Sequence, residues 1–218
     1  MKYIYREAFY MVESVKMEYC DSDGKNNSIF MEYDREDNCW FCQCDREVIR
    51  YKFVVNDIIR LNDPTAKEYM HDEKWEVWSV PGERVEILPE LDTYVISNNI
   101  NNGVKNAVKK THYIYDRPID IYTGVSVRNV KGLHSLTYMC FQPDGSIYML
   151  EESSIGQFET NEADYEVIFK NRISRIQGRN AEGMWSIQLY MDGKCIVKDY
   201  FAIKRNVLSN IVLLDCKI

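Results

Sequence analysis

Three cysteines lie close together in the first half of the chain. Residues 39–44 read CWFCQC and contain a C-x-x-C spacing, which forms half of a common zinc site. A zinc knuckle needs a tight turn of small residues between its two cysteines. Trp40 and Phe41 fill that place, and both suit a pleated strand on which Cys42 and Cys44 share one face. We therefore expect buried free thiols here, with no metal and no other cofactor.

A second segment, residues 21–27, reads DSDGKNN and has the composition of a calcium loop. An EF-hand places its glycine at the sixth position and a bidentate Glu at the twelfth. Counting from Gly24 puts Tyr19 first and Phe30 twelfth, so both carboxylate ligands are missing. The segment predicts an ordinary turn.

The candidate general bases are His71, His112 and His134, and none of them lies in a recognisable catalytic motif. His134 precedes Ser135, but neighbours on a strand point to opposite faces and are not expected to share a proton. The chain contains no G-x-S-x-G, H-E-x-x-H or phosphate-binding glycine loop. We expect no catalytic residues, although a hydrolase that uses paired carboxylates stays open, because such pairs meet only in space.

Exposed acids and indoles of the first half are the candidates for binding. Acids steer a basic partner, and indoles bury a large area at little entropic cost. Trp75 and Trp185 correspond to each other in the repeated signatures described below and are therefore expected in the core, which leaves Trp40 and Trp78 as candidates for the surface. The expected binding residues of this half are Asp34, Glu36, Asp37, Trp40, Asp45 and Trp78.

The basic residues concentrate in the second half, at Lys170, Arg172, Arg175 and Arg179. Two interpretations are open. The basic segment attracts the acidic first half through complementary fields, or it forms an anion site. In the second case Arg172 and Arg175 bind an anionic ligand in a cleft between the halves.

The elements that must position these residues are strands. Asp precedes Gly145 and Gly193, and each glycine separates two apolar runs, which is typical of short hairpins. The alternation of apolar residues predicts strands over 48–55 and 185–191, and helical periodicity is never sustained. We predict an all-β fold of small antiparallel sandwich-like or barrel-like units with little helix.

Short signatures occur twice in the same order, which indicates an internal duplication. Tyr19-Cys20 and the Asp23-Gly24 turn correspond to Met139-Cys140 and Asp144-Gly145. Two later signatures start at Asn56 and Trp75, and their counterparts start at Asn171 and Trp185. The predicted units are residues 1–97 and 118–218, joined by residues 98–117 with an expected short helix.

Charge differs between the two halves. Residues 1–97 carry 12 Lys and Arg against 21 Asp and Glu, a balance of −9, while residues 98–218 carry 15 against 13, a balance of +2. The net charge of −7 argues against nucleic acid, which is bound by excess Lys and Arg. We expect a cytoplasmic protein without a membrane span, because no apolar run approaches ~20 residues and the odd number of cysteines suits free thiols.

These features favour a non-catalytic binding protein. The interpretation that we prefer is an acidic inhibitor or immunity-type protein that masks a partner with a basic surface. The alternative is a protein that binds or processes an anionic small molecule, such as a nucleotide, in the cleft between the halves. A structural component that assembles through strand edges is a third possibility.

Overall fold

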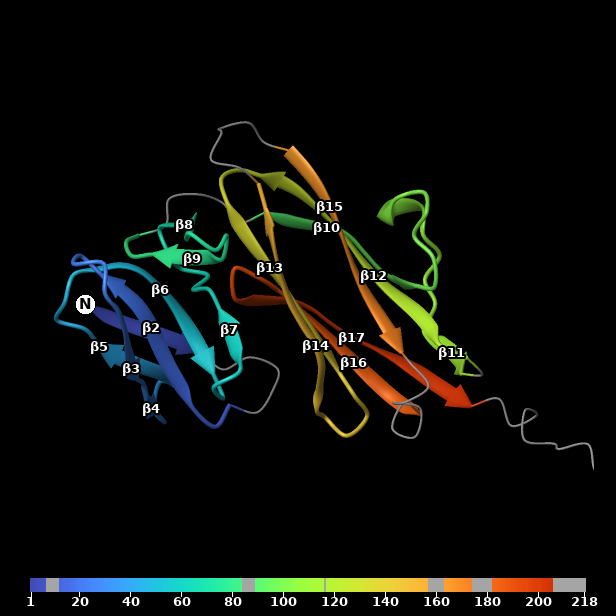
Figure 1. Ribbon diagram of the computed structural model, residues 1–218, viewed down its shortest axis with the longest axis horizontal. Helices are drawn as coiled ribbons and strands as arrows, with labels where there is room; N and C mark the ends of the chain where they lie inside the picture. The colour runs from blue at the N-terminus through green and yellow to red at the C-terminus, as the bar shows by residue number, and fades with distance from the viewer. Residues whose placement is uncertain (7–11, 84–88, 116, 157–162, 174–181, 206–218) are drawn as a thin grey trace, which may run out of the picture.

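The computed structural model describes residues 1–6, 12–83, 89–115, 117–156, 163–173 and 182–205. These residues form four sheets and one 3-10 turn, η1 at Val104–Asn106 (Figure 1). Nearly all strand pairs are antiparallel. The predicted all-β fold with little helix is therefore confirmed.

Two sheets that share a core make up what we call the N-terminal unit. The smaller sheet has the order β1-β5-β4, and the larger has the order β3-β2-β6-β9-β8, with β7 paired to β6. The strand bounds are β1 Lys2–Arg6, β2 Val15–Asp21, β3 Asn26–Phe30, β4 Glu32–Asp34, β5 Cys39–Gln43, β6 Val48–Val55, β7 Ile59–Leu61, β8 Glu68–His71 and β9 Val77–Val80.

Alternation along β2 and β6 separates the core of this unit from its outer face. Met17 and Phe53 are fully buried, and the ring of Phe53 lies edge-on to that of Tyr5 from the facing sheet, with 5.4 Å between centroids. Because successive side chains point to opposite faces, the neighbours Glu18 and Lys52 project from the outer face of the larger sheet. Charged side chains therefore collect on that outer face.

The other two sheets form the C-terminal unit. Their orders are β10-β12-β15 and β11-β17-β16-β13-β14, and the pair β11–β17 is parallel. Tyr138 and Phe169 stack between the two sheets with their ring centroids 4.7 Å apart. The strand bounds are β10 Glu90–Ser97, β11 His112–Tyr115, β12 Ile119–Val130, β13 His134–Phe141, β14 Ile147–Ile155, β15 Ala163–Ile173, β16 Gly183–Met191 and β17 Lys194–Arg205.

Strand β13 is buried along its whole length. Tyr138 faces the core of the C-terminal unit, whereas Met139 and Phe141 pack into the core of the N-terminal unit together with Tyr190 of β16. The five-stranded sheet thus lies between its partner sheet and the N-terminal unit (Figure 1). The boundary between the units is consequently a packed apolar interface.

The duplication inferred from the repeated signatures is not confirmed. The first signature does correspond, since β2–β3 and β13–β14 are both antiparallel hairpins with a glycine of positive φ in the turn, Gly24 and Gly145. The later signatures fall on strands with different pairing. Asn56 follows β6, which pairs with β2, whereas Asn171 lies on β15, in the sheet opposite β13.

The boundary predicted after residue 97 does not coincide with the boundary between the sheets of the two units. β10 ends at Ser97 but pairs with β12, so the last strand before the seam belongs to the C-terminal unit. The short helix expected between the units is the single turn η1.

Candidate functional site

The acids predicted to bind a partner lie on two separate loops. Asp34, Glu36 and Asp37 occupy the β4–β5 turn, where Asp34 Oδ1 accepts hydrogen bonds from the backbone N–H groups of Glu36 (2.9 Å) and Asp37 (3.3 Å). Exposed Asp45 follows the other end of β5. Since a strand rises ~3.4 Å per residue, β5 separates the two loops by roughly 17 Å.

Two tryptophans are placed contrary to expectation. Trp78 is only 7% exposed, so it is not the surface anchor that the sequence suggested. Trp75, expected in the core, is 77% exposed because it lies in the turn before β9, where strand alternation does not apply. Trp40 is half-buried, and its ring tilts against that of Tyr33 with 5.2 Å between centroids.

Arg172 lies far from these residues, near the end of β15. Its side chain is exposed, and its Nε lies 4.0 Å from Asp120 Oδ1. The other oxygen of Asp120, Oδ2, pairs with Lys170 Nζ at 2.9 Å. β15 belongs to the sheet that the five-stranded sheet separates from the N-terminal unit. Arg172 is therefore not brought together with the acidic residues, and Arg175 lies outside the described residues.

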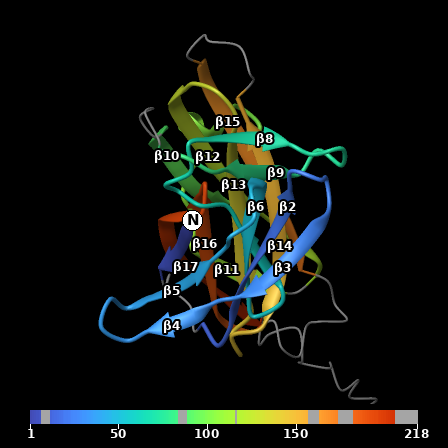
Figure 2. The ribbon, with the colours of Figure 1, turned by 90° about the vertical axis from the view of Figure 1, so that its left-hand side faces the viewer.

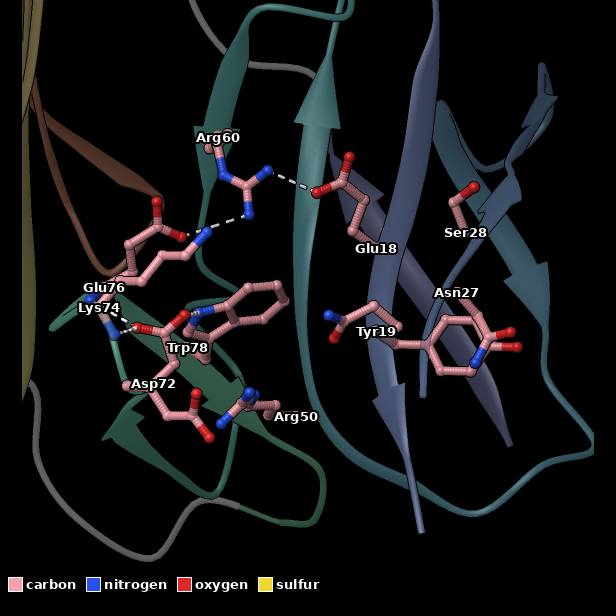
Figure 3. Close-up of a pocket in the computed structure, with 12 residues that line it drawn as sticks. Glu18, Tyr19, Asn27, Ser28, Arg50, Arg60, Asp72, Lys74, Glu76 and Trp78 are labelled. Atoms are coloured by element: carbon pink, nitrogen blue, oxygen red, sulfur yellow. Dashed lines mark hydrogen bonds and ion pairs between the residues drawn. The ribbon is translucent and has the colours of Figure 1, made fainter. Parts of the chain in front are cut away.

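A cavity of about 530 Å³ opens on the outer face of the larger N-terminal sheet (Figure 3). We call it the Trp78 pocket. Polar and charged side chains from β2, β3, β6, β7 and the β8–β9 hairpin surround the indole of Trp78. The lining residues are Glu18, Tyr19, Asn26, Asn27, Ser28, Arg50, Arg60, Asp72, Glu73, Lys74, Glu76 and Trp78.

Three cations surround the indole of Trp78. The guanidinium carbons of Arg60 and Arg50 lie 5.4 Å and 5.5 Å from the ring centroid, and Lys52 Nζ lies 5.9 Å from it. Arg60 pairs with Glu18 at 2.5 Å and with Glu76 at 3.5 Å. Among the described residues, no carboxylate lies within ion-pair distance of Arg50. Cation–π contacts of this kind hold the buried ring and its cations together.

Asp72 organises the β8–β9 turn at the rim of the pocket. Its Oδ1 accepts hydrogen bonds from the backbone N–H groups of Lys74 (2.8 Å) and Glu76 (3.0 Å), and its Oδ2 accepts one from Trp78 Nε1 (3.1 Å). Burial acts to raise the pKa of Asp72, but these bonds and the charge of Arg50 outweigh it and lower the pKa. The carboxylate thus fixes the turn in its charged form.

The turn that Asp72 organises carries Trp75 outward. Trp75 has a φ of 65°, an uncommon backbone conformation for a bulky side chain, and its ring meets that of His71 edge-on with 5.2 Å between centroids. Its turn and the β4–β5 turn lie near opposite ends of the N-terminal unit (Figure 2). Sequence reasoning missed Trp75, although the turn-forming Asp72 three residues earlier was the available signal.

His134 is the most buried of the three histidines, and both of its ring nitrogens are in hydrogen-bonding contacts. His134 Nδ1 lies 2.7 Å from Asp192 Oδ2, and its Nε2 lies 2.9 Å from the carbonyl oxygen of Lys131. Both ring nitrogens therefore face hydrogen-bond acceptors. Ser135 Oγ accepts a hydrogen bond from Asn62 Nδ2 at 2.9 Å and is not paired with the ring in the described structure. The hydrogen bond between Asn62 and Ser135 joins the two units.

The cysteines of the CWFCQC segment are buried free thiols. Burial raises the pKa of Cys42 to about 11. Within the described ranges, no three His, Cys, Asp or Glu side chains converge as metal ligands. In the same ranges, no helix has the length and apolar character needed to span a membrane.

Comparisons with known proteins do not place the chain in a family. No family model and no curated protein matches it. The CARDB domain of a Pyrococcus furiosus protein, in complex with di-metal ions, matches with a TM-score of 0.33 and 13% identity over 56% of this chain and 95% of that chain. A Bacteroides uniformis β-glucuronidase matches at 0.38 and 10% over 92% and 26%, and a Listeria innocua β-glucosidase at 0.31 and 6% over 58% and 18%.

The chain spans about a quarter or less of the length of these two glycosidases. At identities and TM-scores this low, the likenesses carry no argument about function.

Proposed function

We propose that this chain is a non-catalytic binding protein of the inhibitor or immunity type, which masks a partner with a basic surface. The observation that supports this most is Trp75, an indole that is 77% exposed at the tip of a fixed turn. Large aromatic side chains of this kind dominate the energy of protein–protein interfaces. The docking face consists of the β8–β9 turn and the adjoining Trp78 pocket.

The charge of the β8–β9 turn favours a basic partner. In this turn Asp72, Glu73 and Glu76 flank Trp75, and Lys74 is the one cation among them. In the adjoining pocket Arg60 is already paired with Glu18 and Glu76. Glu73 is exposed and has no ion pair with any described residue, so its charge is available to a partner. The more distant acids, such as Glu36 and Asp37, raise the association rate through long-range electrostatic attraction and do not contact the partner.

We also propose that the protein is located in the cytoplasm. Cys20, Cys39, Cys42, Cys44, Cys140 and Cys195 are free thiols. A reducing compartment keeps thiols in that state.

The test is affinity capture from the native cell with the full chain, followed by mass spectrometry. Trp75→Ala is compared with Phe30→Ala, a matched control because Phe30 is 72% exposed on β3, at the opposite edge of the same sheet. We expect a basic protein that elutes at raised salt, is retained by Phe30→Ala, and binds Trp75→Ala at least about 30-fold more weakly. An acidic partner, or equal retention by both variants, contradicts the proposal.

A further inference from the structure

A second cavity, of about 490 Å³, lies where the two units meet. Its walls are the last residues of β1, Phe53 of β6, the loop of residues 63–65, and residues 193–195 at the β16–β17 turn. We call it the inter-unit pocket. It is distinct from the Trp78 pocket, with which it shares no lining residue.

Packed backbone preforms this pocket. A Cβ atom at Gly193 would lie 1.8 Å from the carbonyl oxygen of Asn62, so the β16–β17 turn is in direct contact with the loop that precedes Asp63. Asn62 also donates a hydrogen bond to Ser135 Oγ across the unit boundary. These contacts within the protein therefore set the distance between the two walls, and the pocket keeps its shape without a ligand.

The interior of the pocket is mainly apolar. Ile4, Phe53, Pro64 and the half-buried Cys195 contribute hydrocarbon or thiol surface. Asp63 is the acidic lining residue, and both of its oxygens are engaged, Oδ2 by the hydroxyl of Tyr51 and Oδ1 by Thr65. A ligand whose buried part, its body, has no polar groups suits such an interior, because a buried polar group without a partner is unfavourable.

Two cations stand at the mouth. Arg6 and Lys194 line the pocket and are also exposed to solvent. Arg6 Nη1 donates a hydrogen bond to the backbone oxygen of Asp37 at 3.2 Å. Neither cation has an ion pair with a carboxylate of the described residues. An anionic group held at the mouth would meet both charges while remaining partly hydrated.

We infer that the inter-unit pocket binds an amphipathic organic acid, with its apolar body inside and its carboxylate between Arg6 and Lys194. Its volume lies within the ~300–1,000 Å³ of small-molecule sites. The anionic ligand expected from the sequence at Arg172 and Arg175 is here assigned to different cations. This inference does not rest on the proposed docking of a basic protein.

Calorimetric titration of the full chain with decanoate tests the inference. Decanol, which has the same body without the charge, and acetate, which has the charge without the body, are the matched probes. We expect one equivalent of decanoate to bind, at least about fivefold more tightly than decanol, and acetate to show no binding at the same concentrations. Binding of decanol as tight as that of decanoate, several equivalents, or no binding of decanoate overturns the inference.

Variants locate the site. Arg6→Gln and Lys194→Gln should each weaken decanoate binding about fivefold. Lys25→Gln removes a similarly exposed charge in the β2–β3 turn and should leave the affinity unchanged. Equal affinity in all three variants overturns the assignment. Trp75→Ala should bind decanoate as the wild type does, so failure of the docking proposal and failure of this one are distinguishable.

Discussion

Lys52 Nζ donates a hydrogen bond to Glu152 Oε2 over 2.6 Å, which connects β6 of the N-terminal unit with β14 of the C-terminal unit. The Lys52 side chain is almost wholly buried, whereas the Glu152 side chain is 23% exposed. Glu152 Oε1 is buried without a hydrogen-bond partner among the described residues. A buried ammonium in one unit thus depends on a carboxylate supplied by the other.

Glu152→Gln should destabilise the protein by about 3 kcal/mol, because it leaves the buried ammonium of Lys52 without a counter-charge. Lys52→Met should cost less, about 1 kcal/mol, since it removes the buried charge itself, and the side chain of Glu152 that remains is partly exposed. Urea unfolding measures both. The control is Glu151→Gln, an exposed neighbour on β14 that should change stability by less than about 0.5 kcal/mol. Equal costs for Glu152→Gln and Glu151→Gln would refute the prediction.

Gly193→Ala should destabilise the protein far more than Gly145→Ala. The two glycines have nearly the same φ, 87° and 85°, so the backbone strain of an alanine, about 1 kcal/mol, is common to both. Only Gly193 adds a clash, with the carbonyl oxygen of Asn62, while a Cβ at Gly145 meets nothing within 4 Å. We expect at least about 3 kcal/mol for Gly193→Ala from thermal or urea unfolding. Similar losses for the two variants would show that the turn moves away without cost.

The sequence was sufficient to predict the class of fold and many of its strands. The strand predicted over 48–55 is β6, and the one over 185–191 lies within β16, Gly183–Met191. Local alternation and turn chemistry carry that information. The burial of β13 on both faces was not predicted, because it depends on a second unit that packs against Met139 and Phe141.

The candidate site was predicted less well, for the same physical reason. Trp75 was predicted to be buried because it corresponds to Trp185 in the repeated signatures, which left Trp78 as a candidate for the surface. The exposure of the two side chains is the reverse. The hydrogen bonds of Asp72 bend the chain at Trp75, and strand β9 starts only at Val77. The link between Lys52 and Glu152 joins residues 100 positions apart, a distance over which sequence patterns carry no information.

The contribution of Asp72 to stability should depend on pH. Its pKa in the folded protein lies below the ordinary value of 3.8, so the stabilisation is present above that value and is lost as the pH falls through the folded pKa. Asp72→Asn should therefore be less stable than the wild type at neutral pH, and the difference should shrink towards about pH 3. Urea midpoints at the two pH values measure this. Glu73→Gln, at an exposed carboxylate in the same turn, should show little difference at either pH, and a gap between wild type and Asp72→Asn that does not change with pH would exclude a charged role for Asp72.

We predict that Trp75, the proposed anchor for the partner, lowers the stability of the folded protein through its backbone conformation. Its φ of 65° is strained for any residue with a Cβ and unstrained for glycine. Trp75→Gly and Trp75→Ala both remove the ring contact with His71, so the difference between them isolates the backbone term. We expect Trp75→Gly to be more stable than Trp75→Ala by about 1 kcal/mol in urea unfolding.

Both variants should nevertheless lose the basic partner to the same extent, because both lack the indole. Phe30→Ala, equally exposed but on an extended strand, provides the comparison, since Phe30→Gly should be less stable than Phe30→Ala there. If Trp75→Gly proved no more stable than Trp75→Ala, the turn would have relaxed so that residue 75 no longer adopts a positive φ, and the predicted strain would be absent. If Trp75→Gly retained the partner, the strained indole would not be the anchor, and the docking face would have to lie elsewhere on the acidic unit.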